Sequence, residues 1–161
     1  MPRVITNNGY DIGYEEAGEG EATPIVFLHG VGSDKSVWRP QLEFFAQSRR
    51  AIAVDYPGYG DSDPAPEGTT RDDYASAIIS AMHELGVDRA HVCGLSLGGI
   101  VAIAIAHADE SRCASLIVSM RPFLHPSSSR GAVRTASAWL SVPWPLRTGT
   151  RMPLRPIAAG Q

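Results

Sequence analysis

Short apolar runs alternate along the chain with segments whose apolar residues recur at helical spacing. Four runs have the nearly continuous hydrophobic character of strands that are covered on both faces of a sheet. They occupy residues 24–28, 51–54, 90–93 and 114–120. Upstream, an Asn-Asn-Gly turn signal at residues 7–9 joins two further strands, over 4–6 and 10–15, into a hairpin.

Three segments between the later runs predict helices. Ser36 is positioned to cap the first, and Thr70 with Asp73 resembles a capping box at the start of the second. Gly86 supplies the glycine that commonly ends such a helix. The helices are expected over residues 37–45, 70–85 and 99–107. Strands that alternate with helices in this way predict an α/β fold with a doubly wound, mostly parallel sheet.

The regular pattern ends near Met120, and the charge of the chain changes there too. All 17 acidic residues lie at or before Glu110, whereas the last 41 residues hold six arginines, six prolines and no acid. We therefore divide the chain into a folded part, residues 1–120, and an irregular Arg/Pro/Ser-rich tail, residues 121–161. Within the tail, only residues 132–142 are expected to form a short helix.

The composition of this tail suggests a hypothesis about its origin. One lysine accompanies 13 arginines in the chain, which is typical of a GC-rich gene, and a shifted reading frame in such a gene yields Arg, Pro, Ser and Ala. The tail is therefore expected to be out of frame or disordered. Its arginines are scattered rather than clustered, which disfavours a nucleic-acid-binding tail.

The overall composition is that of an ordinary globular protein. Of its residues 43% are hydrophobic and 19% charged, and the net charge is −3. The sequence shows neither a membrane-spanning run nor a signal peptide, so a cytoplasmic protein is expected. Cys93 and Cys113 are too few for a disulfide framework or a cysteine metal site, and no metal or cofactor is expected.

The pattern with the most chemical content is the Gly-x-Ser-x-Gly sequence from Gly94 to Gly98. It lies between a predicted strand and a predicted helix, which is the context that a nucleophile elbow requires. A serine on such a sharp turn projects its hydroxyl above the sheet, close to the free amides at the helix N-terminus. The flanking glycines leave room for the tight backbone.

Two further motifs, in the right order along the chain, make the resemblance to a family specific. They are Phe27-Leu28-His29-Gly30-Val31-Gly32 and Asp55-Tyr56-Pro57-Gly58-Tyr59-Gly60-Asp61-Ser62. With the elbow, they make the chain similar to the N-terminal half of an α/β-hydrolase, in the branch of enol-lactonases, serine esterases and haloperoxidase-like proteins. The resemblance covers roughly residues 3–120 and implies a sheet of hydrolase type truncated after strand six.

This resemblance implies a role for each matching residue. Ser96 matches the nucleophile, and the backbone amides of Val31 and Leu97 match the two donors of the oxyanion hole. His29 and Gly30 match the turn that supports this hole, and Gly94 and Gly98 match the glycines of the elbow. The implied substrate is a small carboxylic ester, lactone or enol-lactone, attacked to give an acyl-enzyme. No cofactor, nucleic acid or membrane is implied.

The acid and the histidine that complete a catalytic triad follow the serine in this family, and no residue of the chain matches them. After Ser96 the only acids are Asp109 and Glu110, and the only histidines are His107 and His125. The catalytic acid and the catalytic histidine are therefore unassigned. The alternative to a serine hydrolase is a catalytically inactive fragment, or a small-molecule-binding module of the same fold. The sequence leaves the oligomeric state open.

Overall fold

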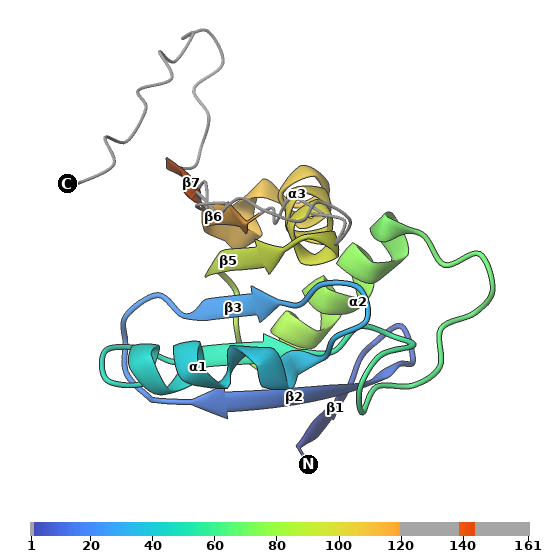
Figure 1. The fold of residues 1–161 in the computed structure, drawn as a ribbon, viewed down its shortest axis with the longest axis horizontal. Helices are drawn as coiled ribbons and strands as arrows, with labels where there is room; N and C mark the ends of the chain where they lie inside the picture. Colours follow the sequence, from blue (N-terminus) through green and yellow to red (C-terminus); the bar gives the residue numbers. More distant parts are fainter. Residues whose placement is uncertain (1, 120–138, 144–161) are drawn as a thin grey trace, which may run out of the picture.

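A twisted sheet with helices on both faces organises the computed structural model of the chain (Figure 1). The structure describes residues 2–119 and 139–143. Over these residues the sheet has seven strands, in the order β1-β2-β4-β3-β5-β6-β7. The strands are β1 (Arg3–Ile5), β2 (Asp11–Ala17), β3 (Ile25–Leu28), β4 (Ala51–Val54), β5 (Ala90–Leu95), β6 (Cys113–Ser119) and β7 (Trp139–Pro143).

The four central strands, β4-β3-β5-β6, are parallel, whereas β1, β2 and β7 pair antiparallel with their neighbours. All six strands predicted from the sequence are present, and the doubly wound, mostly parallel sheet is confirmed. The predicted hairpin is also confirmed, because β1 pairs with β2 across the turn that contains Gly9, at a φ of 89°. The carboxyl ends of β4, β3 and β5 therefore lie side by side at one edge of the sheet.

Strand periodicity divides the core into two layers. In β3 and β4, one set of alternate residues packs with α2 and α3, and the other set packs with α1, so each helix layer covers its own face. The helical elements are the 3-10 helix η1 (Lys35–Trp38), α1 (Arg39–Phe45), α2 (Arg71–Glu84), α3 (Leu97–Ala108) and the 3-10 helix η2 (Glu110–Arg112).

Two sequence expectations about helices were wrong. Asp34, rather than Ser36, caps the first helical segment, because its carboxylate accepts a hydrogen bond from the Ser36 amide. The segment also begins as η1 before it continues as α1, which carries a proline in its first turn. The short helix expected over residues 132–142 is contradicted at residues 139–142, which belong to β7; residues 132–138 lie outside the described part.

The capping box at Thr70 is confirmed. The Thr70 hydroxyl accepts from the Asp73 amide, and the Asp73 carboxylate accepts from the Thr70 amide at 2.8 Å. Gly86 follows the helix at a φ of 68°, a backbone conformation that glycine adopts without steric cost. Both ends of α2 are thus specified by local sequence.

Replacing Thr70 with Ala is expected to lower the free energy of unfolding by about 1 kcal/mol, because the Asp73 amide in the first turn of α2 loses its acceptor. Chemical denaturation with a circular-dichroism readout measures the change. Thr69→Ala is the control, since its hydroxyl bonds to the Pro66 carbonyl rather than to a helix amide. Equal effects of the two substitutions would contradict the capping assignment.

Candidate active site

Ser96 lies at the junction of β5 and α3, in a backbone conformation that non-glycine residues rarely adopt. Its φ is 54° and its ψ is −112°, and it is the only non-glycine residue with positive φ in the described part of the chain. Such a conformation costs about 1–3 kcal/mol and persists only where the surrounding structure enforces it. The Ser96 amide donates to the Ser119 carbonyl at 2.9 Å, and the side chain is exposed.

Close backbone packing enforces this conformation from both sides of the serine. A Cβ atom at Gly94 would overlap the carbonyl of Gly98, and a Cβ atom at Gly98 would overlap the carbonyl of Leu28 at the end of β3. A Cβ atom at Gly99 would come within 2.7 Å of the Val118 side chain. The start of α3 is therefore pressed against the ends of β3 and β5, and Ser96 takes the turn between them.

The turn after β3 lies beside Ser96. A Cβ atom built on Gly30 would stand 3.5 Å from the Ser96 Cβ and 3.4 Å from the Leu95 carbonyl oxygen. Val31 follows with 71% of its side chain exposed. Leu97 is the first residue of α3, so its amide is one of the first-turn donors that have no acceptor within a helix. The structure thus brings together Gly30, Ser96 and the flanking residues Val31 and Leu97.

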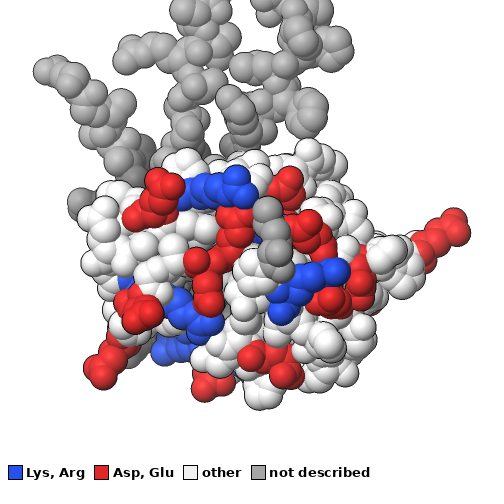
Figure 2. Space-filling view, turned by 90° about the horizontal axis from the view of Figure 1, so that it is seen from below, with Lys and Arg blue, Asp and Glu red and all other residues white. Residues whose placement is uncertain are grey.

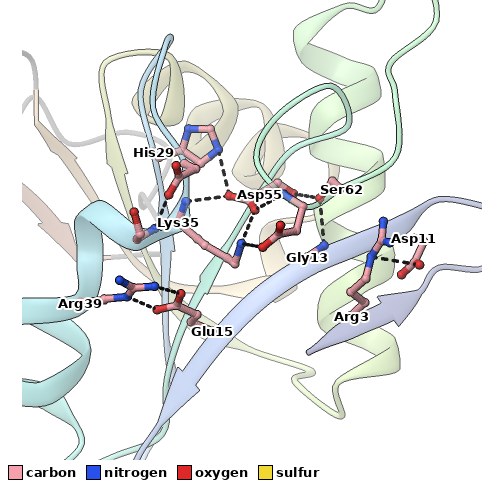
Figure 3. Close-up of polar contacts among 12 residues, drawn as sticks. Arg3, Asp11, Gly13, Glu15, His29, Lys35, Arg39, Asp55 and Ser62 are labelled. Atoms are coloured by element: carbon pink, nitrogen blue, oxygen red, sulfur yellow. Dashed lines mark hydrogen bonds and ion pairs between the residues drawn. The ribbon is translucent and has the colours of Figure 1, made fainter. Parts of the chain in front are cut away.

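His29 braces this turn from inside the protein. Its side chain is fully buried, its Nδ1 lies 2.9 Å from the Gly30 carbonyl oxygen, and its own carbonyl accepts from the Tyr56 hydroxyl at 3.1 Å. Its Nε2 lies 3.8 Å from Asp55 Oδ1 (Figure 3). Burial lowers the pKa of His29, which favours the neutral ring. The ring packs against Tyr56 and Tyr59, consistent with a bracing role rather than a reacting one.

The other ionisable residues considered from the sequence lie away from Ser96. Asp109 follows the last residue of α3, about 18 Å along the helix from its first turn. Its carboxylate accepts from Ser111 and Arg112, and the Ser111 hydrogen bond contributes most to its lowered pKa. His107 is exposed near the same end. No histidine of the described residues hydrogen-bonds to Ser96: these are His29, His83, His91 and His107, and His125 lies outside the described part.

Near the site, two aromatic residues pack in the core, and one charged residue was not anticipated from the sequence. Trp38 and Tyr56 are both buried, and Trp38 stacks on Phe27 with 4.9 Å between ring centroids. Lys35 was missed altogether. It is 3% exposed and forms ion pairs with Asp55 and Asp61. The only signal for it was a single lysine closely following the His-Gly turn.

Charged side chains on the surface form pairs rather than a patch of one sign. The face shown in Figure 2 carries acidic and basic side chains interspersed, without a basic stripe of the kind that binds nucleic acid. Ion pairs of β2 such as Glu15 with Arg39 and Glu16 with Arg50 illustrate this pairing. Within residues 2–119 and 139–143, no group of three or more His, Cys, Asp or Glu could hold a metal ion, and none of the helices could span a membrane.

Gly98→Ala tests the close packing beneath Ser96. Helix propensity alone predicts that alanine stabilises α3 by about 0.5–1 kcal/mol. The overlap with the Leu28 carbonyl predicts the opposite sign, a net loss of about 1–3 kcal/mol in the free energy of unfolding. Ile103→Ala, at an exposed position of the same helix, serves as the control in chemical denaturation. A Gly98→Ala protein that is more stable than the unaltered chain would contradict this description of the junction.

Comparisons with known proteins agree with this geometry. A family model described as the alpha/beta hydrolase family matches residues 25–160. The chain is 36% identical over 103 residues to the dihydrolipoyllysine-residue acetyltransferase component of an acetoin cleaving system from Pseudomonas putida, a match that covers 64% of this chain and 28% of the relative. It is 30% identical over 117 residues to 3-oxoadipate enol-lactonase 1 of Acinetobacter baylyi, covering 72% of this chain and 44% of the relative.

A solved structure has a similar fold. The thermophilic esterase of Thermogutta terrifontis superposes with a TM-score of 0.69 at 30% identity, over 73% of this chain and 45% of the esterase. The chain thus spans less than half the length of each of these proteins. The family model covers most of the chain, and the fold and the order of the motifs agree with it. The chain belongs to the alpha/beta hydrolase family.

Proposed function

We propose that the protein is a serine hydrolase that cleaves a small carboxylic ester, lactone or enol-lactone through an acyl-enzyme on Ser96. The observation that carries this proposal is the exposed serine held at positive φ immediately before the first residue of α3, beside the turn after β3. The similar proteins include one named an enol-lactonase and one named an esterase, which supports this substrate class. The proposed reaction uses no cofactor.

The chemistry follows from the position of the hydroxyl. Ser96 Oγ attacks the acyl carbon, and the electron pair of the carbonyl double bond moves onto its oxygen. The amides of Val31 and Leu97 donate to this oxyanion, each contributing about 2.7–4 kcal/mol to the stabilisation of the transition state. Collapse of the intermediate expels the alcohol oxygen, which leaves with the proton lost by Ser96, and the acyl group stays on the serine. Water then releases the acid and restores the serine.

Removal of the proton from the Ser96 hydroxyl requires a general base, and this step limits the rate at which the chain turns over its substrate. The described histidines do not bond to the serine, and Asp109 lies at the far end of α3. We therefore propose that the chain itself lacks the catalytic acid and histidine, and that its turnover is residual. Oxyanion stabilisation and binding alone can still accelerate such a reaction ~10³- to 10⁴-fold over water.

A fluorophosphonate probe and a short-chain p-nitrophenyl ester test the proposal directly. The unaltered chain is expected to be labelled slowly on one serine and to turn over the ester slowly, and Ser96→Ala is expected to abolish both. Ser111→Ala is the matched control, because Ser111 is an exposed serine at a helix start that already bonds to a carboxylate.

Three outcomes would count against one part or another of the proposal. Labelling that persists in Ser96→Ala would assign the nucleophile to another residue. A folded chain that is never labelled, yet binds the ester without cleaving it, would favour the alternative, a small-molecule-binding module of the same fold. Fast turnover that depends on Ser96 would instead show that the chain supplies an acid and a histidine.

A further inference from the structure

The buried ion cluster beneath the turn after β3 is not used by the chemistry above. Its centre is Lys35, the only lysine of the chain, with 3% of its side chain exposed. Lysine is almost never buried unless it is paired. Its Nζ lies 2.6 Å from Asp55 Oδ2 and 2.6 Å from Asp61 Oδ2. Figure 3 shows Lys35 reaching toward Asp55. One ammonium group thus joins η1 to two points of the loop after β4.

Asp55 receives donors on both carboxylate oxygens. The backbone amide of Lys35 donates to Oδ1 at 2.6 Å, and the Asp61 amide donates to Oδ2 at 2.9 Å. The carboxylate is fully buried, so it depends on these partners for the solvation it has lost. Burial lowers the pKa of Lys35, but hydrogen bonds to Asp55 and Asp61 more than offset this and raise it, so the lysine stays charged.

This cluster fixes one end of the turn, and a neighbouring contact fixes the other. Residues 29–34 run from the end of β3 to the start of η1. At the first end, the Tyr56 hydroxyl donates to the His29 carbonyl, and at the second, Asp55 holds Lys35 by its amide and its ammonium. Asp55 and Tyr56 are consecutive in the chain. The two ends of the turn are therefore tied to one short segment that leaves β4.

Only the middle of the turn approaches the nucleophile. Gly30 lies against Ser96, Val31 is exposed, and Gly32 has a φ of 71°. The position of the Val31 amide thus depends on how firmly the two ends are held, because the middle lies near the protein surface. We propose that Lys35 is a positioning residue, which anchors the turn through Asp55 and Asp61 so that the Val31 amide faces the oxyanion. This role rests on the proposed function, since it requires an oxyanion at Ser96.

Three variants separate anchoring from folding. Lys35→Met removes the ammonium and keeps the volume of the side chain, but it leaves Asp55 buried without its counter-ion. Lys35→Met combined with Asp55→Asn also removes the buried negative charge, which protects the fold while the anchor stays broken. Arg39→Met is the matched control. Arg39 follows Lys35 by four residues and lies outside the cluster, and the substitution removes a cation that makes two hydrogen bonds to Glu15.

Two readouts are needed, amide hydrogen exchange over residues 30–34 and the rate at which the fluorophosphonate labels Ser96. In the double variant, exchange of the turn amides is expected to rise about tenfold or more, and labelling to slow by about 10- to 100-fold, since small displacements of a catalytic donor have such effects. The thermal transition should remain cooperative. Arg39→Met should leave both readouts unchanged.

The outcomes are distinguishable. Unchanged exchange in a folded double variant overturns the anchoring role, whatever Ser96 does. Faster exchange with an unchanged labelling rate shows that Lys35 serves stability alone and overturns the positioning role. If the unaltered chain is not labelled at all, the proposed function fails first, and the positioning role falls with it.

Discussion

The contact between the start of α3 and the ends of β3 and β5 determines the geometry of the whole site. Gly94 and Gly98 bring three backbone segments closer than any side chain permits. The chain must reverse between Leu95 and Leu97 within a single residue, and Ser96 takes a φ of 54° to do so. The side chain of Ser96 is exposed at this junction. The strain in one residue is offset by packing in its neighbours.

The same edge of the sheet collects the other polar groups. β4, β3 and β5 are adjacent and parallel, and each is followed within one residue by a functional candidate: Asp55, His29 and Ser96. Asp55 and His29 are both fully buried: Asp55 accepts from the Lys35 amide at the start of η1, and the His29 ring packs against Tyr56 in the loop after β4. The exposed Ser96 therefore lies at the same end of the sheet as the buried polar residues Asp55 and His29. Rigid support of this kind is what a preorganised oxyanion site requires.

Local sequence was sufficient to predict much of this arrangement. The apolar runs predicted the four strands from β3 to β6, because a strand covered on both faces of a sheet has a nearly continuous hydrophobic sequence, and the Asn-Asn-Gly turn signal predicted the hairpin of β1 and β2. The Thr70 capping box and the turn at Gly9 could also be predicted, because each depends on residues within four positions of one another. The elbow was recognisable from its glycines, because backbone contacts at Gly94 and Gly98 leave no room for a side chain at either position.

Features that depend on contacts between distant segments could not be predicted. The Lys35 side chain meets Asp55 and Asp61 only after β3 and β4 pair, and 20 residues of sequence separate Lys35 from Asp55. The cap at Asp34 was missed because two candidate cap residues stand two positions apart, and backbone geometry selects between them. Residues 139–142 were expected to end a short helix, but they pair antiparallel with β6 and form a strand.

The most direct test of the central claim uses thiol chemistry at the elbow. In Ser96→Cys, the introduced thiol should be alkylated rapidly in the native protein, with its pKa lowered by the N-terminus of α3. The two native cysteines are internal controls, because Cys93 and Cys113 are buried and burial raises the pKa of each to about 11. Modification at position 96 alone, until the protein unfolds, is the predicted result. Equally slow modification of all three thiols would contradict an outward-facing residue at this junction.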